Sequence, residues 1–113
     1  MSGVPIWANG VVGSLSHDSR IAVAAVGWGR DFSALGINVE PREPLPSEQL
    51  DLVATPQERA KNRWSPYYER LLFAAKEAVY KAVYPLDQTL LDHQDVEVSL
   101  TNRQAVVRNG RVV

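Results

Sequence analysis

A carboxylate lies among aromatic side chains in the second half of the chain. At 100° per residue of a helix, Phe73, Glu77 and Tyr80 fall within one narrow arc, and Tyr84 lies in the same arc. Lys81 follows Glu77 by four residues, which is the spacing of an ion pair on a helix surface. Two interpretations are open: an ordinary surface pair beside amphipathic tyrosines, or a buried acidic site.

Two more oxygen-bearing side chains alternate in the segment Leu35–Glu40. Side chains repeat every two residues along a strand, so Asn38 and Glu40 would share one strand face. Together with a third oxygen ligand from a helix, they suit a hard cation such as Mg²⁺ that bridges to substrate phosphates. The alternative is an exposed polar strand face without a ligand.

The segment Gly13–His17 ends in hydroxyl groups and an imidazole. Ser16 and His17 offer neutral donors and a ring that gains charge near neutral pH, which suits an anion. The same residues also suit a turn. A Ser-His-Asp catalytic set is poorly supported, because Ser16, His17 and Asp18 are consecutive and such sets are assembled in space.

The elements that would position these residues begin with a small β-rich region. Three strands are predicted, separated by Gly, Asp, Ser and Arg clusters. They cover residues 11–16, 21–28 and 35–40. Three prolines within residues 41–46 then predict an extended loop, followed by a short helix over residues 47–53.

Helices dominate the middle of the chain and strands its end. Thr55-Pro56-Gln57-Glu58 is a helix-start pattern and predicts a helix over residues 56–63. Ser65-Pro66 repeats the pattern and predicts a long helix over residues 66–84, with Leu71, Leu72 and Val79 on its core face. The final predictions are a strand over residues 96–100 and a hairpin, residues 105–107 and 112–113, closed by Asn109-Gly110.

Composition excludes several classes of protein. The chain has 113 residues with 12 Lys and Arg against 13 Asp and Glu, so it lacks the positive charge that nucleic-acid binding requires. The longest apolar run, Ile21–Trp28, is far shorter than the ~20 residues that span a bilayer. The absence of cysteine excludes disulfides and thiolate metal sites. We therefore expect one cytoplasmic domain without a membrane span.

Three segments resemble, in order, the signature blocks of the 4'-phosphopantetheinyl transferases, particularly the enterobactin synthase component D type. They are Gly3–Trp7 continuing through Gly13–His17, then Gly36–Glu40, then Phe73–Lys81. The matched region spans most of the chain, from Gly3 to about Val98. The resemblance implies that the protein modifies carrier proteins. Siderophore biosynthesis is a pathway that this type of enzyme would serve.

The resemblance implies transfer of the phosphopantetheine arm of coenzyme A to a serine of an acyl or peptidyl carrier protein, with release of adenosine 3',5'-bisphosphate. It implies Mg²⁺ on the coenzyme A pyrophosphate, with Asn38, Glu40 and Glu77 as metal ligands. Glu77 and Lys81 are the implied catalytic residues. A carboxylate near the metal, such as Glu77, can take the serine proton, while the cation and lysine stabilise charge on the leaving group.

The resemblance also implies contacts to the rest of coenzyme A. Lys76 and Lys81 match positions that contact the phosphates, whereas Ser16 and His17 match positions that reach the 3'-phosphate. The turn from Gly3 to Pro5 matches the stretch beside the adenine.

The implied fold is α+β: a 4'-phosphopantetheinyl transferase-like lobe with a small antiparallel sheet packed on the long helix. We expect residues 1–113 to form a single partial domain, lacking the N-terminal part and the C-terminal end of the family, which favours self-association. Asn38 replaces the usual Asp, so the affinity for Mg²⁺ should fall. The alternative function is a catalytically impaired module that only binds a carrier protein or nucleotide.

Overall fold

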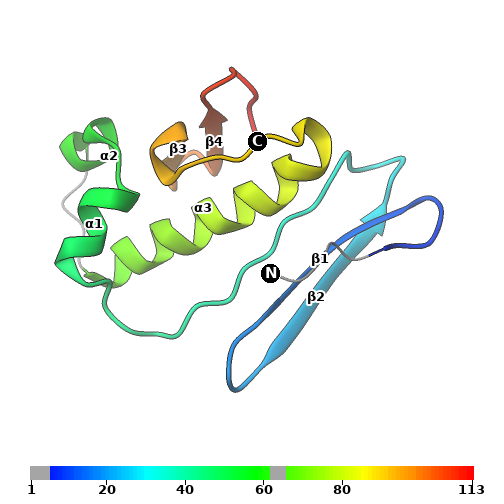
Figure 1. Cartoon of the computed structure of the whole chain (residues 1–113), viewed down its shortest axis with the longest axis horizontal. Coiled ribbons are helices and arrows are strands. Elements are labelled where there is room, and N and C mark those ends of the chain that lie inside the picture. Colours follow the sequence, from blue (N-terminus) through cyan, green and yellow to red (C-terminus); the bar gives the residue numbers. More distant parts are fainter. Residues whose placement is uncertain (1–5, 62–65) are drawn as a thin grey trace. The chain divides into compact units, whose positions relative to one another are not determined.

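The computed structural model describes residues 6–61 and 66–113. The chain forms two compact units, and each is described by itself. Unit 1 consists of Met1–Val39 and Glu77–Thr89, whereas unit 2 consists of Glu40–Lys76 and Leu90–Val113. The long helix α3 (Pro66–Asp87) contributes its first half to unit 2 and its second half to unit 1 (Figure 1).

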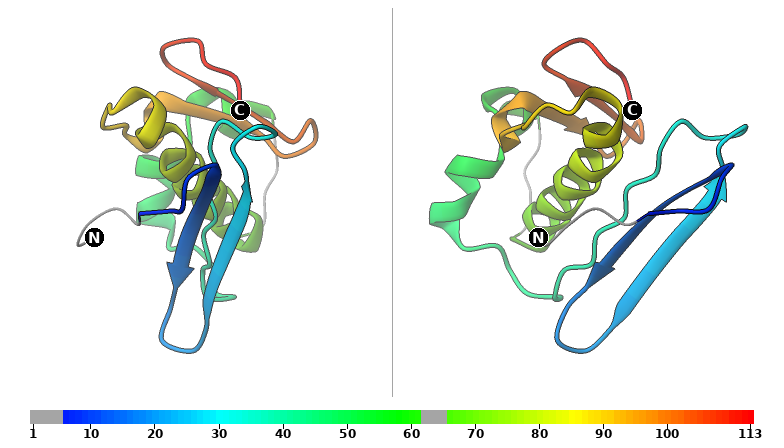
Figure 2. Two further views of the ribbon diagram at one scale, coloured as in Figure 1. Left: turned by 90° about the vertical axis from the view of Figure 1, so that its right-hand side faces the viewer. Right: turned by 45° about the vertical axis from the view of Figure 1, so that its right-hand side comes forward.

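Unit 1 is built on a β-hairpin. Strands β1 (Val11–His17) and β2 (Ala22–Trp28) pair antiparallel, with a register that runs from Val11 opposite Trp28 to His17 opposite Ala22. Alternation along β1 buries Ser14 and Ser16 and leaves Leu15 and His17 exposed. Both predicted strands are confirmed. Figure 2 shows the hairpin from two further directions.

The third predicted strand is wrong. Residues 34–40 are extended but belong to neither sheet. The physical reason is where their amides donate: Ile37 N–H donates to Ser14 Oγ at 3.1 Å, and Val39 N–H donates to Ser16 Oγ at 3.0 Å. Two serine hydroxyls of β1 therefore replace the carbonyls of a neighbouring strand.

Gly36 brings this extended segment against the second half of α3. A Cβ atom at this position would lie 2.8 Å from the backbone nitrogen of Ala82 and would also collide with the carbonyl of Ala78. Both neighbours are helix backbone atoms, which cannot rotate away as a side chain can. Glycine is therefore required here by close approach.

Unit 2 contains the predicted short helices. Helix α1 (Ser47–Val53) confirms the helix predicted after the proline-rich loop, and α2 (Pro56–Lys61) confirms the second start signal. The rest of the predicted helix, residues 62–63, lies outside the described residues. Thr55 and Glu58 form the expected reciprocal cap: Thr55 N–H donates to Glu58 Oε1 at 2.7 Å and Glu58 N–H to Thr55 Oγ1 at 3.1 Å.

A second small sheet completes unit 2. Strands β3 (Val96–Ser99) and β4 (Gln104–Val107) pair antiparallel after a 3-10 helix η1 (His93–Asp95). The chain then turns at Gly110, whose φ of 91° suits glycine, and returns so that Val112 bridges to Val106. The α+β class and the Asn-Gly turn are confirmed, but the single sheet is wrong because each unit has its own two-stranded sheet.

Helix α3 differs from its prediction in length and in its buried face. It runs through Pro85 to Asp87, and Gln88 N–H donates to Tyr84 O at 2.7 Å. A proline removes only its own donor, so the last turn still forms. Leu72 is fully buried as predicted, but Leu71 is 51% exposed and Lys76 is buried.

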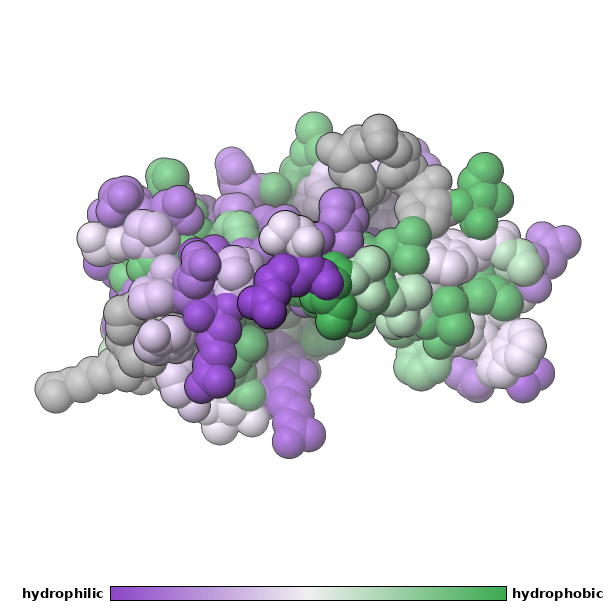
Figure 3. All heavy atoms as spheres, turned by 90° about the horizontal axis from the view of Figure 1, so that it is seen from below, coloured by the Kyte–Doolittle hydropathy of each residue, from purple (hydrophilic) through white to green (hydrophobic). Residues whose placement is uncertain are grey.

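Hydrophobic side chains also occur at the surface. On β2, Val26 and Trp28 point outward and are 64% and 54% exposed. The space-filling view shows hydrophobic and hydrophilic residues interleaved over one face (Figure 3). None of the helices in the described part of the chain has the length and apolar character needed to span a membrane.

Candidate functional site

Unit 1 brings Ser16, Asn38 and Lys81 together, although they are separated widely in sequence. Asn38 Oδ1 accepts a hydrogen bond from Ser16 Oγ at 3.3 Å and one from Lys81 Nζ at 3.5 Å. An ammonium group can only donate, so the oxygen of the Asn38 amide, and not its nitrogen, faces Lys81. Three predicted site residues thus share one cluster.

Lys81 uses all three of its N–H donors inside unit 1. Besides Asn38, its Nζ donates to the backbone carbonyls of Leu15 at 3.0 Å and Ile37 at 3.1 Å. These contacts link α3, β1 and the extended segment. The bond to Asn38 is the longest of the three, so it is the one that a ligand would displace most easily.

The structure also places two other predicted site residues of unit 1, His17 on β1 and Glu77 on α3. His17 is exposed at the end of β1. Glu77 is half-buried on α3. Gly3 and Pro5 lie outside the described residues.

Glu40 lies in unit 2, where it pairs with Arg70. Arg70 Nη1 donates to Glu40 Oε1 at 3.1 Å, and both side chains are largely buried, at 17% and 20% exposure. The same guanidinium donates to the carbonyls of Glu43 and Pro44, at 3.2 and 3.3 Å. Arg70 therefore holds the loop that begins at Glu40, and it gives this carboxylate a cationic partner.

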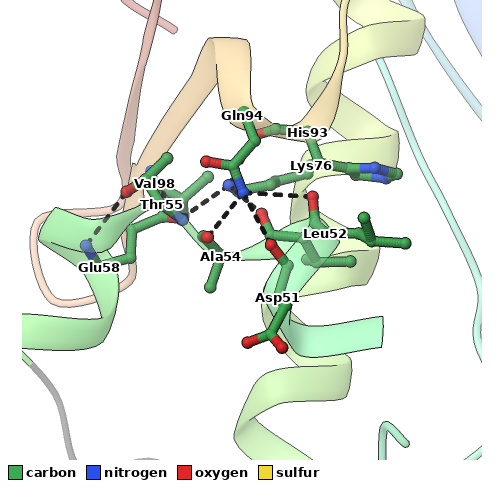
Figure 4. A network of polar contacts seen from close by, with 10 residues as sticks. Asp51, Leu52, Ala54, Thr55, Glu58, Lys76, His93, Gln94 and Val98 are labelled. Atoms are coloured by element: carbon green, nitrogen blue, oxygen red, sulfur yellow. Dashed lines mark hydrogen bonds and ion pairs between the residues drawn. The ribbon is translucent and has the colours of Figure 1, made fainter. Parts of the chain in front are cut away.

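Lys76 is buried in unit 2 and has three short bonds (Figure 4). Its Nζ donates to Val53 O at 2.6 Å, Glu58 Oε1 at 2.7 Å and His93 O at 2.8 Å. Every donor of the ammonium group is used within the unit. A phosphate contact would require breaking these bonds in a core position, so we assign Lys76 to the packing of unit 2.

Glu58 completes this network. Its Oε1 accepts from Lys76 and Thr55, while Oε2 accepts from the amide of Val98 at 2.6 Å. One carboxylate thus connects α2, α3 and β3. Nearby, the side-chain Nε2 of Gln94 donates to Ala54 O at 2.7 Å, which links η1 to the end of α1 (Figure 4).

Burial lowers the pKa of Lys76 below its ordinary value, and the hydrogen bond to Glu58 opposes that shift. Three oxygen acceptors surround the ammonium, and one of them is the carboxylate of Glu58. Lys76 and Glu58 therefore form a buried ion pair in unit 2.

The donor set proposed for a metal consists of Asn38, Glu40 and Glu77. All three supply oxygen, which hard cations prefer. Asn38 and Glu40 already accept from cationic groups, Lys81 and Arg70, and the Asn38 contact is long enough to be exchanged. The oxygen atoms of these three side chains are therefore of the kind that binds a hard cation. Within residues 6–61 and 66–113, no group of three or more His, Cys, Asp and Glu side chains is arranged to hold a metal ion.

Sequence reasoning missed three residues that the structure makes important. Ser14 anchors the extended segment, Arg70 pairs with Glu40, and Glu58 pairs with Lys76. Glu58 had been identified only as a helix cap. The sequence did contain a signal for Ser14. Ser14 and Ser16 share one face of a predicted strand, and Ile37 and Val39 have the same two-residue spacing, so each hydroxyl can meet one backbone amide.

Two family profiles match the chain. One is described as the 4'-phosphopantetheinyl transferase superfamily and matches residues 34–110. The other is described as the 4'-phosphopantetheinyl transferase N-terminal domain and matches residues 1–27. The first match alone covers more than half of the chain.

Three curated relatives have similar sequences over about 100 residues. They are the 4'-phosphopantetheinyl transferases Svp of Streptomyces mobaraensis, Npt of Nocardia iowensis and PptT of Mycobacterium tuberculosis, which are 42%, 41% and 40% identical to it. The alignments cover 86–87% of this chain but only 42–45% of each relative. The chain therefore spans less than half the length of the relatives that it matches.

Proposed function

Because the chain belongs to the 4'-phosphopantetheinyl transferase superfamily, we propose that it transfers 4'-phosphopantetheine from coenzyme A to a serine of an acyl or peptidyl carrier protein. The serine oxygen forms a bond to the phosphorus that carries pantetheine, and the pyrophosphate P–O bond breaks. Adenosine 3',5'-bisphosphate leaves. The observation that carries the proposal is the family match over residues 34–110, which includes Asn38, Glu77 and Lys81.

The proposed metal ligands are Asn38, Glu40 and Glu77. Mg²⁺, when bound, would neutralise charge on the pyrophosphate leaving group. The oxygen chemistry of the three side chains supports this assignment. The contacts of Asn38 to Lys81 and of Glu40 to Arg70 also support it, because two of these oxygens already accept hydrogen bonds from positively charged groups.

Two basic side chains have proposed roles toward coenzyme A. Lys81 lies beside Asn38 and is half-buried, so exchange of its long contact to Asn38 would free one N–H for a pyrophosphate oxygen. His17 is exposed at the end of β1 and is the proposed contact of the 3'-phosphate. The turn from Gly3 to Pro5 stays the predicted neighbour of the adenine.

Glu77 is the proposed base. It would accept the proton that the carrier serine loses as its oxygen attacks phosphorus, which raises the nucleophilicity of that oxygen. Its position four residues before Lys81 supports this division of work, because base and cation then lie on one side of α3.

The test is the rate of transfer from coenzyme A to a panel of apo carrier proteins, with magnesium varied. The wild-type chain is expected to label at least one carrier in a magnesium-dependent manner. Glu77→Gln should lower the rate by about 10²-fold or more, since it removes a ligand and the base together. Glu69→Gln, on the same helix, is the matched control and should retain activity. A fully active Glu77→Gln chain would overturn the assignment.

A second function is supported by one specific residue. Asn38 provides a neutral oxygen where the resemblance expects a carboxylate. This difference favours a module that binds a carrier protein or nucleotide without turnover. Coenzyme A binding without transfer to any carrier would select this alternative. The enterobactin type, a siderophore pathway, self-association and a cytoplasmic location stay predictions.

A further inference from the structure

The hydroxyl of Ser16 is buried and points away from the exposed imidazole that follows it. Ser14 and Ser16 are only 6% and 7% exposed, whereas Leu15 and His17 are exposed. Neighbouring side chains on a strand point to opposite faces, so Ser16 and His17 lie on different sides of the hairpin. A single phosphate group bound by His17 would therefore not also meet the Ser16 hydroxyl.

Ser16 has partners of its own on the buried face. Its Oγ accepts from the amide of Val39 at 3.0 Å and donates to Asn38 Oδ1 at 3.3 Å. A hydroxyl has one proton to donate, and the bond to Asn38 uses it. A second donor bond, to a phosphate oxygen, would have to replace the bond to Asn38.

Asn38 lies between two anchored amides. Ser14 holds the amide of Ile37 at 3.1 Å, and Ser16 holds the amide of Val39 at 3.0 Å. Within residues 6–61 and 66–113, no strand pairs with this segment, so these two bonds fix the backbone on either side of Asn38. Ser16 and Lys81 then fix the side chain, because both donate to its oxygen.

We propose that Ser16 is a positioning residue, which sets the backbone and the amide oxygen of Asn38 for the ligand role, and that it does not contact the 3'-phosphate of coenzyme A. Ser14 supports the same segment two residues earlier, where its hydroxyl accepts from the amide of Ile37. The inference rests on the proposed function, since it concerns the orientation of a proposed metal ligand.

The test compares Ser16→Ala, Ser16→Thr and Ser14→Ala in transfer assays with coenzyme A and with 3'-dephospho-coenzyme A. Ser16→Ala is expected to raise the magnesium concentration for half-maximal transfer about three- to tenfold, the effect of losing one or two hydrogen bonds. The ratio of kcat/KM for the two substrates should stay within about twofold of wild type. Ser16→Thr keeps the hydroxyl and should restore the magnesium response, while Ser14→Ala should have a smaller effect.

A second measurement needs no activity. Amide hydrogen exchange in the free chain should accelerate at Val39 in Ser16→Ala and at Ile37 in Ser14→Ala, because each variant removes the acceptor of that amide. A Ser16→Ala chain that loses its preference for coenzyme A over the dephospho form would overturn the inference, as would unchanged exchange at Val39. If the wild type shows no transfer, the proposed function fails, and exchange at Val39 alone decides whether Ser16 positions this segment.

Discussion

Replacing Lys76 by methionine should destabilise the protein far more than a surface lysine or arginine change. Lys76 and Glu58 are each only 2% exposed, and the ammonium donates three bonds between 2.6 and 2.8 Å. Methionine fills similar space but leaves the Glu58 carboxylate buried without its cation. Breaking a buried pair in this way costs about 3–5 kcal/mol, which is a large part of the ~5–15 kcal/mol that stabilises a typical domain.

Two further variants separate charge from packing. In the double variant Lys76→Met with Glu58→Gln, no charge is left in the buried position, and the glutamine oxygen still accepts from a backbone amide. We therefore expect it to be more stable than Lys76→Met alone by about 1–3 kcal/mol. Arg59→Ala is the matched surface control. Arg59 pairs with Asp51, and these side chains are 50% and 66% exposed, so the loss should be at most about 1 kcal/mol.

The assay is urea denaturation followed by circular dichroism, with the slope m compared between variants. The expected order of stability is wild type, Arg59→Ala, the double variant and then Lys76→Met. If Lys76→Met is no less stable than Arg59→Ala at equal m, water reaches the pair in solution and the reasoning from burial is refuted.

Three further outcomes follow from other contacts. Gly36→Ala should lower the free energy of unfolding by about 1–3 kcal/mol, because the added Cβ meets the backbone of α3. Gly29→Ala is the control: its Cβ would have only ordinary contacts, so the free energy of unfolding should change much less. Urea denaturation of both variants measures the difference. The amides of Arg20 and Ile21 lower the pKa of Asp18, so the stabilisation from this turn should be complete above pH ~4 and lost as the pH falls through the lowered pKa. An NMR titration of Asp18 measures this directly, and a pKa at or above the ordinary value contradicts it. Asn38→Asp should lower the magnesium concentration for half-maximal transfer, and an unchanged magnesium response would count against a ligand role.

Much of the secondary structure was predictable because local signals and the final fold agree. The hairpin strands, the cap at Thr55 and the Asn109-Gly110 turn all formed where turn and capping chemistry indicated. The predicted strand at residues 35–40 failed for a tertiary reason. Its alternation is real, but its amides bond to the hydroxyls of Ser14 and Ser16 instead of to a strand.

The candidate site was predictable in part. Residue type and position singled out Asn38, Ser16 and Lys81, the family resemblance supplied their expected roles, and the structure brings these three side chains together in unit 1. The burial of Lys76 was not predictable, because lysine is almost never fully buried without a partner and its partner, Glu58, lies 18 residues away on another helix. Such pairs are determined by packing between elements, which periodicity does not encode.

The most direct measurement of the central claim is the intact mass of an apo carrier protein after incubation with the chain, coenzyme A and Mg²⁺. The account predicts a gain of one phosphopantetheine, located on a serine by peptide fragmentation, with one adenosine 3',5'-bisphosphate released for each carrier modified. Carrier proteins of unchanged mass, in a sample where the chain is folded and binds coenzyme A, would contradict the transferase function.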